Sequence, residues 1–264
     1  MIQVASLRYG VIFKKAFSQP HIFKAFVKDF LDIELEIDKV ETEKSFAPII
    51  GKVDSHFDLF AEDKKHRTIV DIQHARYPDH YDRFLHYHCA ALLEQVASSK
   101  DYSPKLNVFT IVVLTSGDKN GVDIAAIDFD PKDLNGNPLK EISHKIIYLC
   151  PKYVSDKTPE PYRQWLRAID DSLDEEVDEN DYQQAEIKDI FHTIQKDLTT
   201  PQEYAHMKDE YSEGLLRQNE YEKGIEKGKL EGIIENSKKM LAEGIELSLV
   251  AKITGLSLED LKDL

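Results

Sequence analysis

The sequence contains few of the residues on which several classes of protein depend. Only two cysteines, Cys89 and Cys150, occur in 264 residues, too few for the disulfide framework of many small secreted domains. No run of about 18 apolar residues is present, so no helix is predicted to span a membrane. Residues 1–9 lack the basic and apolar regions of a signal peptide. We therefore expect a reduced, cytoplasmic protein that does not bind a membrane.

Positive charge is also scarce. The chain has 34 Lys and Arg against 49 Asp and Glu, a formal net charge of -15, whereas surfaces that bind nucleic acid need a basic footprint. The charge is uneven, however, because residues 170–181 contain eight carboxylates and no Lys or Arg. That run predicts a solvated, loosely ordered segment. Lysines near the N-terminus and the basic residues 64–67 leave room for a local basic surface.

Apolar residues make up 41% of the chain, and their spacing predicts the secondary structure. Helices are expected over residues 8–17, 20–31, 79–98 and 159–170. Strands are expected over residues 33–40, 57–63, 68–73, 106–114, 123–129 and 145–149. The nearly continuous apolar run 106–114 predicts a central strand that is buried on both faces. This order of elements predicts an α+β fold, in which helices flank a mixed sheet.

Beyond residue 181 the pattern is helical. Three glycines recur every four residues within 222–234, a spacing that indicates either close approach of two helices or a loose linker. Gly244 predicts a helix end, and two short helices are expected over 247–254 and 257–264. This pair could form a small helix-turn-helix, but it contains only two lysines and no arginine. We therefore favour homo-oligomerisation through the C-terminal helices.

The most informative stretch is a predicted β-hairpin within residues 57–73. Each of its strands carries one carboxylate among apolar neighbours, Asp58 in the first and Asp71 in the second. Gln73 follows Asp71 at a spacing of two, so both side chains leave the same face of the second strand. A carboxylate within an apolar strand costs free energy unless it is compensated. A bound divalent cation is one such compensation.

These residue types suit the hydrolysis of phosphodiester bonds. Mg²⁺ prefers oxygen ligands, polarises a phosphoryl oxygen and lowers the pKa of a coordinated water. Asp58 and Asp71 could supply two ligands from adjacent strands, and the main-chain carbonyl of Ile72 a third. Gln73 could donate a hydrogen bond to water or phosphate, but it brings no positive charge. The hairpin therefore favours a metal-dependent nuclease that uses Mg²⁺, with Mn²⁺ as a substitute.

The order of Asp58, a hairpin turn and then Asp71-x-Gln73 resembles the PD-(D/E)xK nuclease superfamily. It is most similar to the recombination-promoting nuclease (Rpn) and transposase branch, in which Gln commonly stands in the position of the Lys. The Phe-Lys-Lys-Ala-Phe sequence at 13–17 is similar to the N-terminal motif of that branch. The helix after the hairpin, the glycine-spaced helix and the C-terminal tail also resemble it. The resemblance therefore extends over nearly the whole chain.

The resemblance implies a restriction-endonuclease-like core and Mg²⁺-dependent cleavage of DNA, the expected partner. It implies that Asp58 and Asp71 are metal ligands and that Gln73 is the equivalent of the catalytic lysine. Two positions depart from the pattern. Gly10 stands where the family often has Asp, and Asp71 stands where the branch usually has Glu. These departures leave open an alternative, a catalytically degenerate member that acts as a non-enzymatic interaction or oligomerising protein.

We expect three segments in the chain. Residues 1–170 would form the nuclease-like core, 171–181 an acidic linker and 182–264 a helical region. The expected DNA contacts are the basic side chains of Lys14, Lys15 and Arg83.

Overall fold

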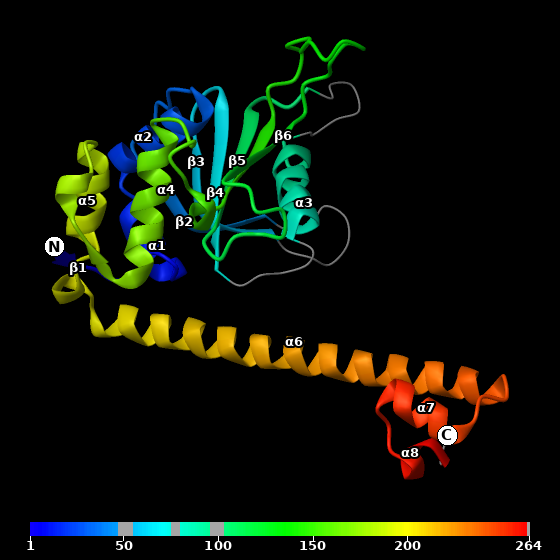
Figure 1. Ribbon diagram of the computed structural model, residues 1–264. Coiled ribbons are helices and arrows are strands. Elements are labelled where there is room, and N and C mark those ends of the chain that lie inside the picture. Colours follow the sequence, from blue (N-terminus) through cyan, green and yellow to red (C-terminus); the bar gives the residue numbers. More distant parts are fainter. Residues whose placement is uncertain (47–54, 75–79, 96–102, 263–264) are drawn as a thin grey trace. The chain divides into compact units, whose positions relative to one another are not determined.

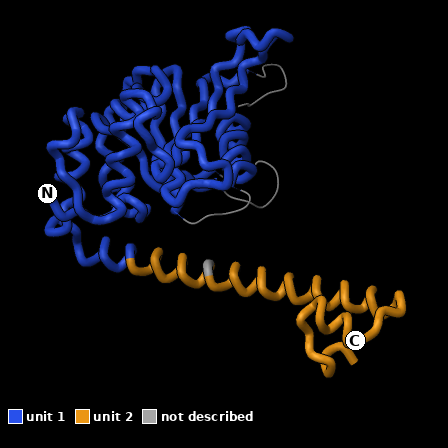
Figure 2. Tube along the Cα trace, in the orientation of Figure 1, with its two compact units in different colours: residues 1–207 blue, residues 208–264 orange. Residues whose placement is uncertain are grey.

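The computed structural model describes residues 1–46, 55–74, 80–95 and 103–262. It divides into two compact units, Met1–Met207 and Lys208–Leu264 (Figure 2). The long helix α6 (Pro201–Ala242) begins in the first unit and ends in the second. Among the described residues, none of the helices combines the length and the apolar character that crossing a membrane requires.

A mixed sheet of six strands lies at the centre of the first unit (Figure 1). In spatial order its strands are β2 (Glu41–Phe46), β3 (Ser55–Glu62), β4 (His66–Gln73), β5 (Asn107–Leu114), β7 (Lys145–Leu149) and β6 (Ile124–Asp128). The pairs β4–β5 and β5–β7 are parallel, and the other three pairs are antiparallel. The apolar strand β5 is central and almost entirely buried, which confirms the prediction for residues 106–114.

Helices cover both faces of this sheet (Figure 1). One face carries α1 (Gly10–Phe17), α2 (Pro20–Leu31), α4 (Tyr162–Asp171) and α5 (Ala185–Thr193), and the other carries α3 (His80–Leu93). On the first face, the ring of Phe17 contacts those of Phe13 and Phe26, and Phe26 meets Trp165 edge to face at 5.2 Å. On the second face, Phe84 of α3 packs against the strands. The α+β fold with a helical C-terminal region is therefore confirmed.

Residues 33–40 do not form the predicted strand. Their apolar side chains do point inward, since Leu35, Ile37 and Val40 are buried, but the main chain is irregular. Side chains bind its polar groups instead, because Lys24 donates to the Ile37 carbonyl at 2.9 Å and Asp63 accepts the N–H of Glu36 at 3.1 Å. The first strand of the central sheet is instead β2, which begins at Glu41, eight residues after the predicted start at residue 33.

The acidic segment 171–181 is folded into the first unit, which extends to Met207. Within it, β8 (Glu176–Val177) pairs with β1 (Ile2–Gln3), and Val177 is 2% exposed. Short 3-10 helices η1 (Pro151–Tyr153), η2 (Ser172–Asp174), η3 (Glu179–Asp181) and η4 (Lys196–Leu198) complete this unit. The prediction of a loosely ordered linker is therefore wrong. The buried side chain of Val177 and the pairing of β8 with β1 hold the segment in the fold despite its many carboxylates.

The second unit consists of most of α6 and two short helices, α7 (Leu247–Thr254) and α8 (Leu258–Lys262). Helix α6 ends at Ala242, and Gly244, two residues later, has a φ of 79° in the left-handed region. Ser257 and Asp260 cap the start of α8 reciprocally, since each side chain accepts the main-chain N–H of the other residue. This arrangement is a capping box.

The glycine-spaced segment lies inside α6 and is helical, so it is not a loose linker. Apart from the neighbouring backbone of α6 itself, a Cβ atom added at Gly224, Gly228 or Gly232 would meet no described atom within 4 Å. Within the described part of the second unit, no other helix therefore approaches this stripe.

Candidate active site

Asp58 and Asp71 lie where strands β3 and β4 diverge. The last pair of their ladder at this end joins Leu59 to Val70. Beyond it, side chains replace the main-chain bonds. Asp71 Oδ1 accepts the N–H of Asp58 at 2.9 Å, and Asp58 Oδ2 accepts the N–H of Ile72 at 3.0 Å. The structure thus brings the two predicted carboxyl groups together in the gap between the strands.

The surroundings of both carboxyl groups favour the protonated form. Asp71 is only 4% exposed. Its burial and the neighbouring charge of Asp58 raise the pKa of Asp71 well above its usual value, against the opposing effects of the Asp58 N–H and the Arg83 charge. Burial also raises the pKa of Asp58, and the Ile72 N–H and the Lys14 ammonium offset this only in part. The pair therefore holds more negative charge than its surroundings compensate.

Each carboxyl group keeps one oxygen that is not bound to the main chain. Asp71 Oδ2 is buried and has no hydrogen-bond partner among the described residues. Asp58 Oδ1 lies 3.6 Å from Lys14 Nζ. A buried acceptor without a partner costs free energy, and two facing carboxylates repel each other. A hard divalent cation would remove both costs, so these residues fit Mg²⁺.

Main-chain and water oxygens would complete the coordination of such a cation. The N–H and C=O of one strand residue point towards the same neighbouring strand, so the Ile72 carbonyl faces β3 as its N–H does. Within the described ranges, no group of three or more His, Cys, Asp or Glu side chains could hold a metal. Among the described residues, the candidate cation site therefore has two carboxylate ligands, Asp58 and Asp71.

Gln73 is buried, with 8% of its surface exposed, two residues after Asp71 on the same strand. Its main-chain carbonyl accepts the N–H of Thr115 at 3.1 Å, which fixes the end of β4 against the loop after β5. Gln73 therefore lies on the same strand as Asp71, at the spacing of two that places both side chains on one face, but it is uncharged.

Basic side chains approach the two carboxyl groups from both faces of the sheet. Lys14 comes from α1 and reaches Asp58. Arg83 comes from α3, where its guanidinium lies over the rings of Phe84 and Tyr87 at 5.6 and 5.3 Å, and its charge acts on Asp71. Two basic side chains, Lys14 and Arg83, therefore adjoin the carboxyl groups of this acidic chain.

Lys15, the other lysine expected to contact DNA, has partners elsewhere. Its ammonium donates to the Leu198 carbonyl at 2.8 Å and to Glu203 at 3.1 Å. It therefore ties α1 to the start of α6.

The sequence analysis missed Glu43. This residue lies in β2 with φ of 56°, in the left-handed region that residues other than Gly rarely adopt. It forms an ion pair with Lys14, and its charge raises the pKa of both Asp58 and Asp71. No signal in the sequence would have found it, because the polar strand β2 has no clear alternation and its local distortion leaves no mark in the residue types.

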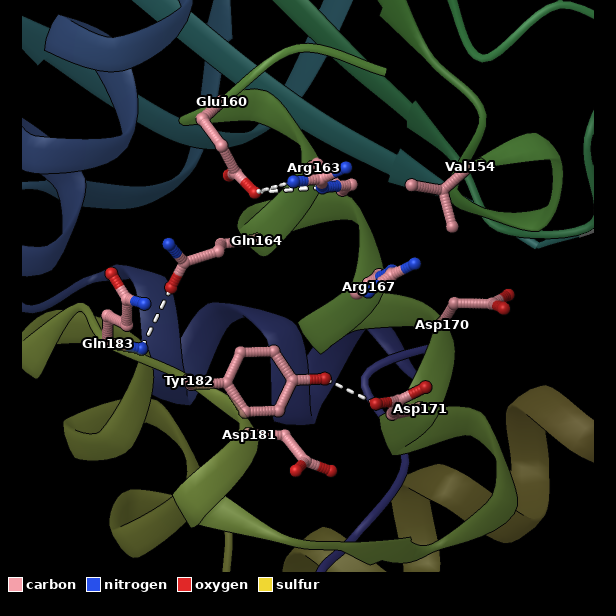
Figure 3. A pocket seen from close by; sticks show the side chains of 10 residues that line it. All are labelled: Val154, Glu160, Arg163, Gln164, Arg167, Asp170, Asp171, Asp181, Tyr182 and Gln183. Carbon is pink, nitrogen blue, oxygen red and sulfur yellow. Dashed lines mark hydrogen bonds and ion pairs between the residues drawn. The ribbon is translucent and has the colours of Figure 1, made fainter. Parts of the chain in front are cut away.

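A second recess, of about 520 Å³, lies beside α4 (Figure 3). Its charged and polar groups bind one another. Glu160 pairs with Arg163 at 2.7 Å, and Gln164 accepts the main-chain N–H of Gln183 at 2.9 Å. The lining residues are Val154, Glu160, Arg163, Gln164, Arg167, Asp170, Asp171, Asp181, Tyr182 and Gln183. None of the predicted site residues is among them, and the Gln164 contact joins α4 to Gln183, just after the acidic segment.

Comparison with known proteins supports the family resemblance at one end of the chain. Residues 238–264 match the model of the Rpn/YhgA-like nuclease family, C-terminal HTH domain. This range covers the end of α6 together with α7 and α8. No curated protein and no solved structure matches the chain. The match supports the Rpn family, and the helix-turn-helix interpretation that the sequence analysis had ranked below oligomerisation.

Proposed function

We propose that this protein is a Mg²⁺-dependent DNA endonuclease of the recombination-promoting nuclease type. The observation that carries the proposal is the meeting of Asp58 and Asp71 in the gap between β3 and β4, where Asp71 Oδ2 is buried and has no hydrogen-bond partner among the described residues. Such an arrangement is costly to the fold. A cation-binding function accounts for that cost.

Asp58, Asp71 and the Ile72 carbonyl would hold the cation. The cation, when bound, polarises the scissile phosphate and lowers the pKa of a coordinated water. Because their other oxygens accept main-chain N–H groups, both aspartates are fixed before the cation arrives. Gln73 would orient the attacking water or a phosphate oxygen by donating a hydrogen bond.

DNA is the proposed partner. The basic side chains of Lys14 and Arg83 adjoin the carboxyl groups and would contact phosphates. The family match of residues 238–264 to a helix-turn-helix domain supports DNA binding by the second unit as well.

Nicking of a supercoiled plasmid tests this function. We expect cleavage with Mg²⁺ or Mn²⁺ by the natural protein, and its loss in Asp58→Asn and Asp71→Asn. Asp189→Asn is the matched control, because this exposed carboxylate pairs with His21 on the surface. Equal cleavage by Asp71→Asn and the natural protein, or no cleavage by the natural protein with either cation, would contradict the proposal.

A second candidate is a non-enzymatic protein that assembles into homo-oligomers through its C-terminal helices. The observation in its favour is the apolar surface of the second unit, where Leu249, Ile253 and Leu258 are 48%, 57% and 49% exposed. Sedimentation of the natural protein and of Leu249→Ser/Ile253→Ser would measure the assembly. This candidate replaces the first one only if calorimetry also shows no saturable binding of Mg²⁺ or Mn²⁺.

A further inference from the structure

Lys14 is positioned as part of the candidate site, although it stands far from the hairpin in the sequence. It lies in α1, which buries Phe13 and Phe17 against the core. The side chain of Lys14 is only 20% exposed, and its ammonium lies between the carboxylates of Glu43 and Asp58. The packing of its neighbours in α1 therefore fixes where this positive charge lies.

The site needs a positive charge that Gln73 does not supply. Negative charge develops on the phosphate oxygens as a phosphodiester is hydrolysed, and fixed cations next to those oxygens stabilise the transition state. The Lys14 ammonium lies 3.6 Å from Asp58 Oδ1, the oxygen of Asp58 that the main chain does not bind. A group held by that oxygen would thus lie next to this ammonium.

Glu43 orients Lys14. It lies in β2 and forms an ion pair with the ammonium. Its side chain is 63% exposed, whereas that of Asp58 is 25% exposed. Of these two carboxylates the ammonium therefore meets one at the surface and one further inside. A Lys side chain is flexible enough to exchange the outer one for a phosphate.

We infer that Lys14 supplies the catalytic positive charge that Gln73 lacks, and that Glu43 is its positioning residue. This inference rests on the proposed nuclease function. When DNA is bound, the ammonium contacts a non-bridging oxygen of the scissile phosphate and remains beside Asp58. No proton transfer is assigned to it. Its role is electrostatic.

Cleavage kinetics of three variants test the inference. Lys14→Gln is expected to lower kcat by about 10²–10³-fold with a smaller change in KM, as loss of a transition-state contact does. Lys14→Arg restores part of kcat, because it restores the charge. Lys28→Gln is the matched control, since Lys28 is a helical lysine in an ion pair with Glu34 at 2.7 Å. It should keep the kcat of the natural protein.

Metal binding separates a catalytic role from a structural one. Calorimetry with Mn²⁺ should show that Lys14→Gln binds the cation at least as tightly as the natural protein, because the substitution removes a positive charge beside Asp58. Loss of Mn²⁺ binding in Lys14→Gln would overturn the inference in favour of a structural role. An unchanged kcat in Lys14→Gln, when Asp71→Asn is inactive, would refute the inference and leave the proposed function standing. Absence of cleavage by the natural protein would contradict both the inference about Lys14 and the proposed nuclease function.

Discussion

The burial of the Asp71 carboxyl group predicts that removing its charge will raise the free energy of unfolding, whether or not the protein is active. In Asp71→Asn, the side-chain oxygen can still accept the N–H of Asp58, as Asp71 Oδ1 does at 2.9 Å. The new amide group replaces Oδ2, the buried acceptor that has no partner among the described residues, and it can donate to Asp58. The substitution therefore removes a buried charge and keeps the hydrogen bond that this side chain accepts from β3.

The expected gain in the free energy of unfolding at neutral pH is about 1–3 kcal/mol, the usual cost of a buried acceptor left unsatisfied. For a unit of this size, each kcal/mol corresponds to about 2–4 °C in Tm. The sign follows from linkage. Because the pKa of Asp71 is raised in the folded state above the value of 3.8 for an ordinary Asp, the folded protein binds this proton more tightly than the unfolded chain. The free energy of unfolding of the natural protein therefore falls as the pH rises from about 3.8 towards the raised pKa of Asp71 in the folded state.

Urea denaturation followed by tryptophan fluorescence measures this effect. The chain has one tryptophan, and Trp165 is fully buried in the first unit, so its emission reports the unit that contains Asp71. Asp71→Asn should exceed the natural protein in stability at neutral pH and approach it at acid pH. Asp189→Asn, at the surface, should show neither effect.

Mg²⁺ should reduce the difference in stability between Asp71→Asn and the natural protein. A cation that binds only the folded natural protein stabilises it by about 2.7 kcal/mol at a concentration of 100 Kd, which offsets the advantage of the variant. The reasoning is refuted if Asp71→Asn is less stable than the natural protein at neutral pH, or if the difference between them does not depend on pH.

Three further substitutions have defined outcomes. Arg67→Ala should lower the free energy of unfolding by about 1–3 kcal/mol in the same assay, because Arg67 is 6% exposed and binds two carboxylates and a carbonyl of α3. Gly117→Ala should be more destabilising than Gly121→Ala, since both glycines have positive φ but only the first would place a Cβ 2.6 Å from the ring of Tyr153; equal effects would contradict the contact. Gly228→Ala should increase helicity by circular dichroism and stabilise α6 by about 1 kcal/mol, because its Cβ would meet nothing in the described chain within 4 Å.

Five of the six strands of the central sheet, including the two of the hairpin, could be predicted from the sequence, because they follow from local patterns of apolar and polar side chains. The apolar run of β5 and the position of Asp58 and Asp71 on either side of the turn are local patterns. Alternation alone could not separate a paired strand from an extended segment. Residues 33–40 alternate because their apolar side chains anchor the segment to the core, while side chains bind its main chain.

The rest of the site depends on contacts between distant segments. Lys14 and Glu43 meet only because α1 packs across the sheet and β2 is locally distorted. Neither event follows from local propensity. The acidic segment 171–181 was misjudged for a related reason, since its charges are a property of composition whereas its place in the fold is decided by Val177 and its pairing with β1.

The hydrogen bonds between the aspartates and the main chain also act during folding. Asp58 and Asp71 lie opposite each other only in the register that pairs Leu59 with Val70, and a slip of one residue would turn every side chain of a strand to the other face. Each aspartate then loses the N–H that it accepts from the other strand. The two acids therefore contribute to the choice of register, so a hairpin that has closed correctly already holds both aspartates of the candidate site in place.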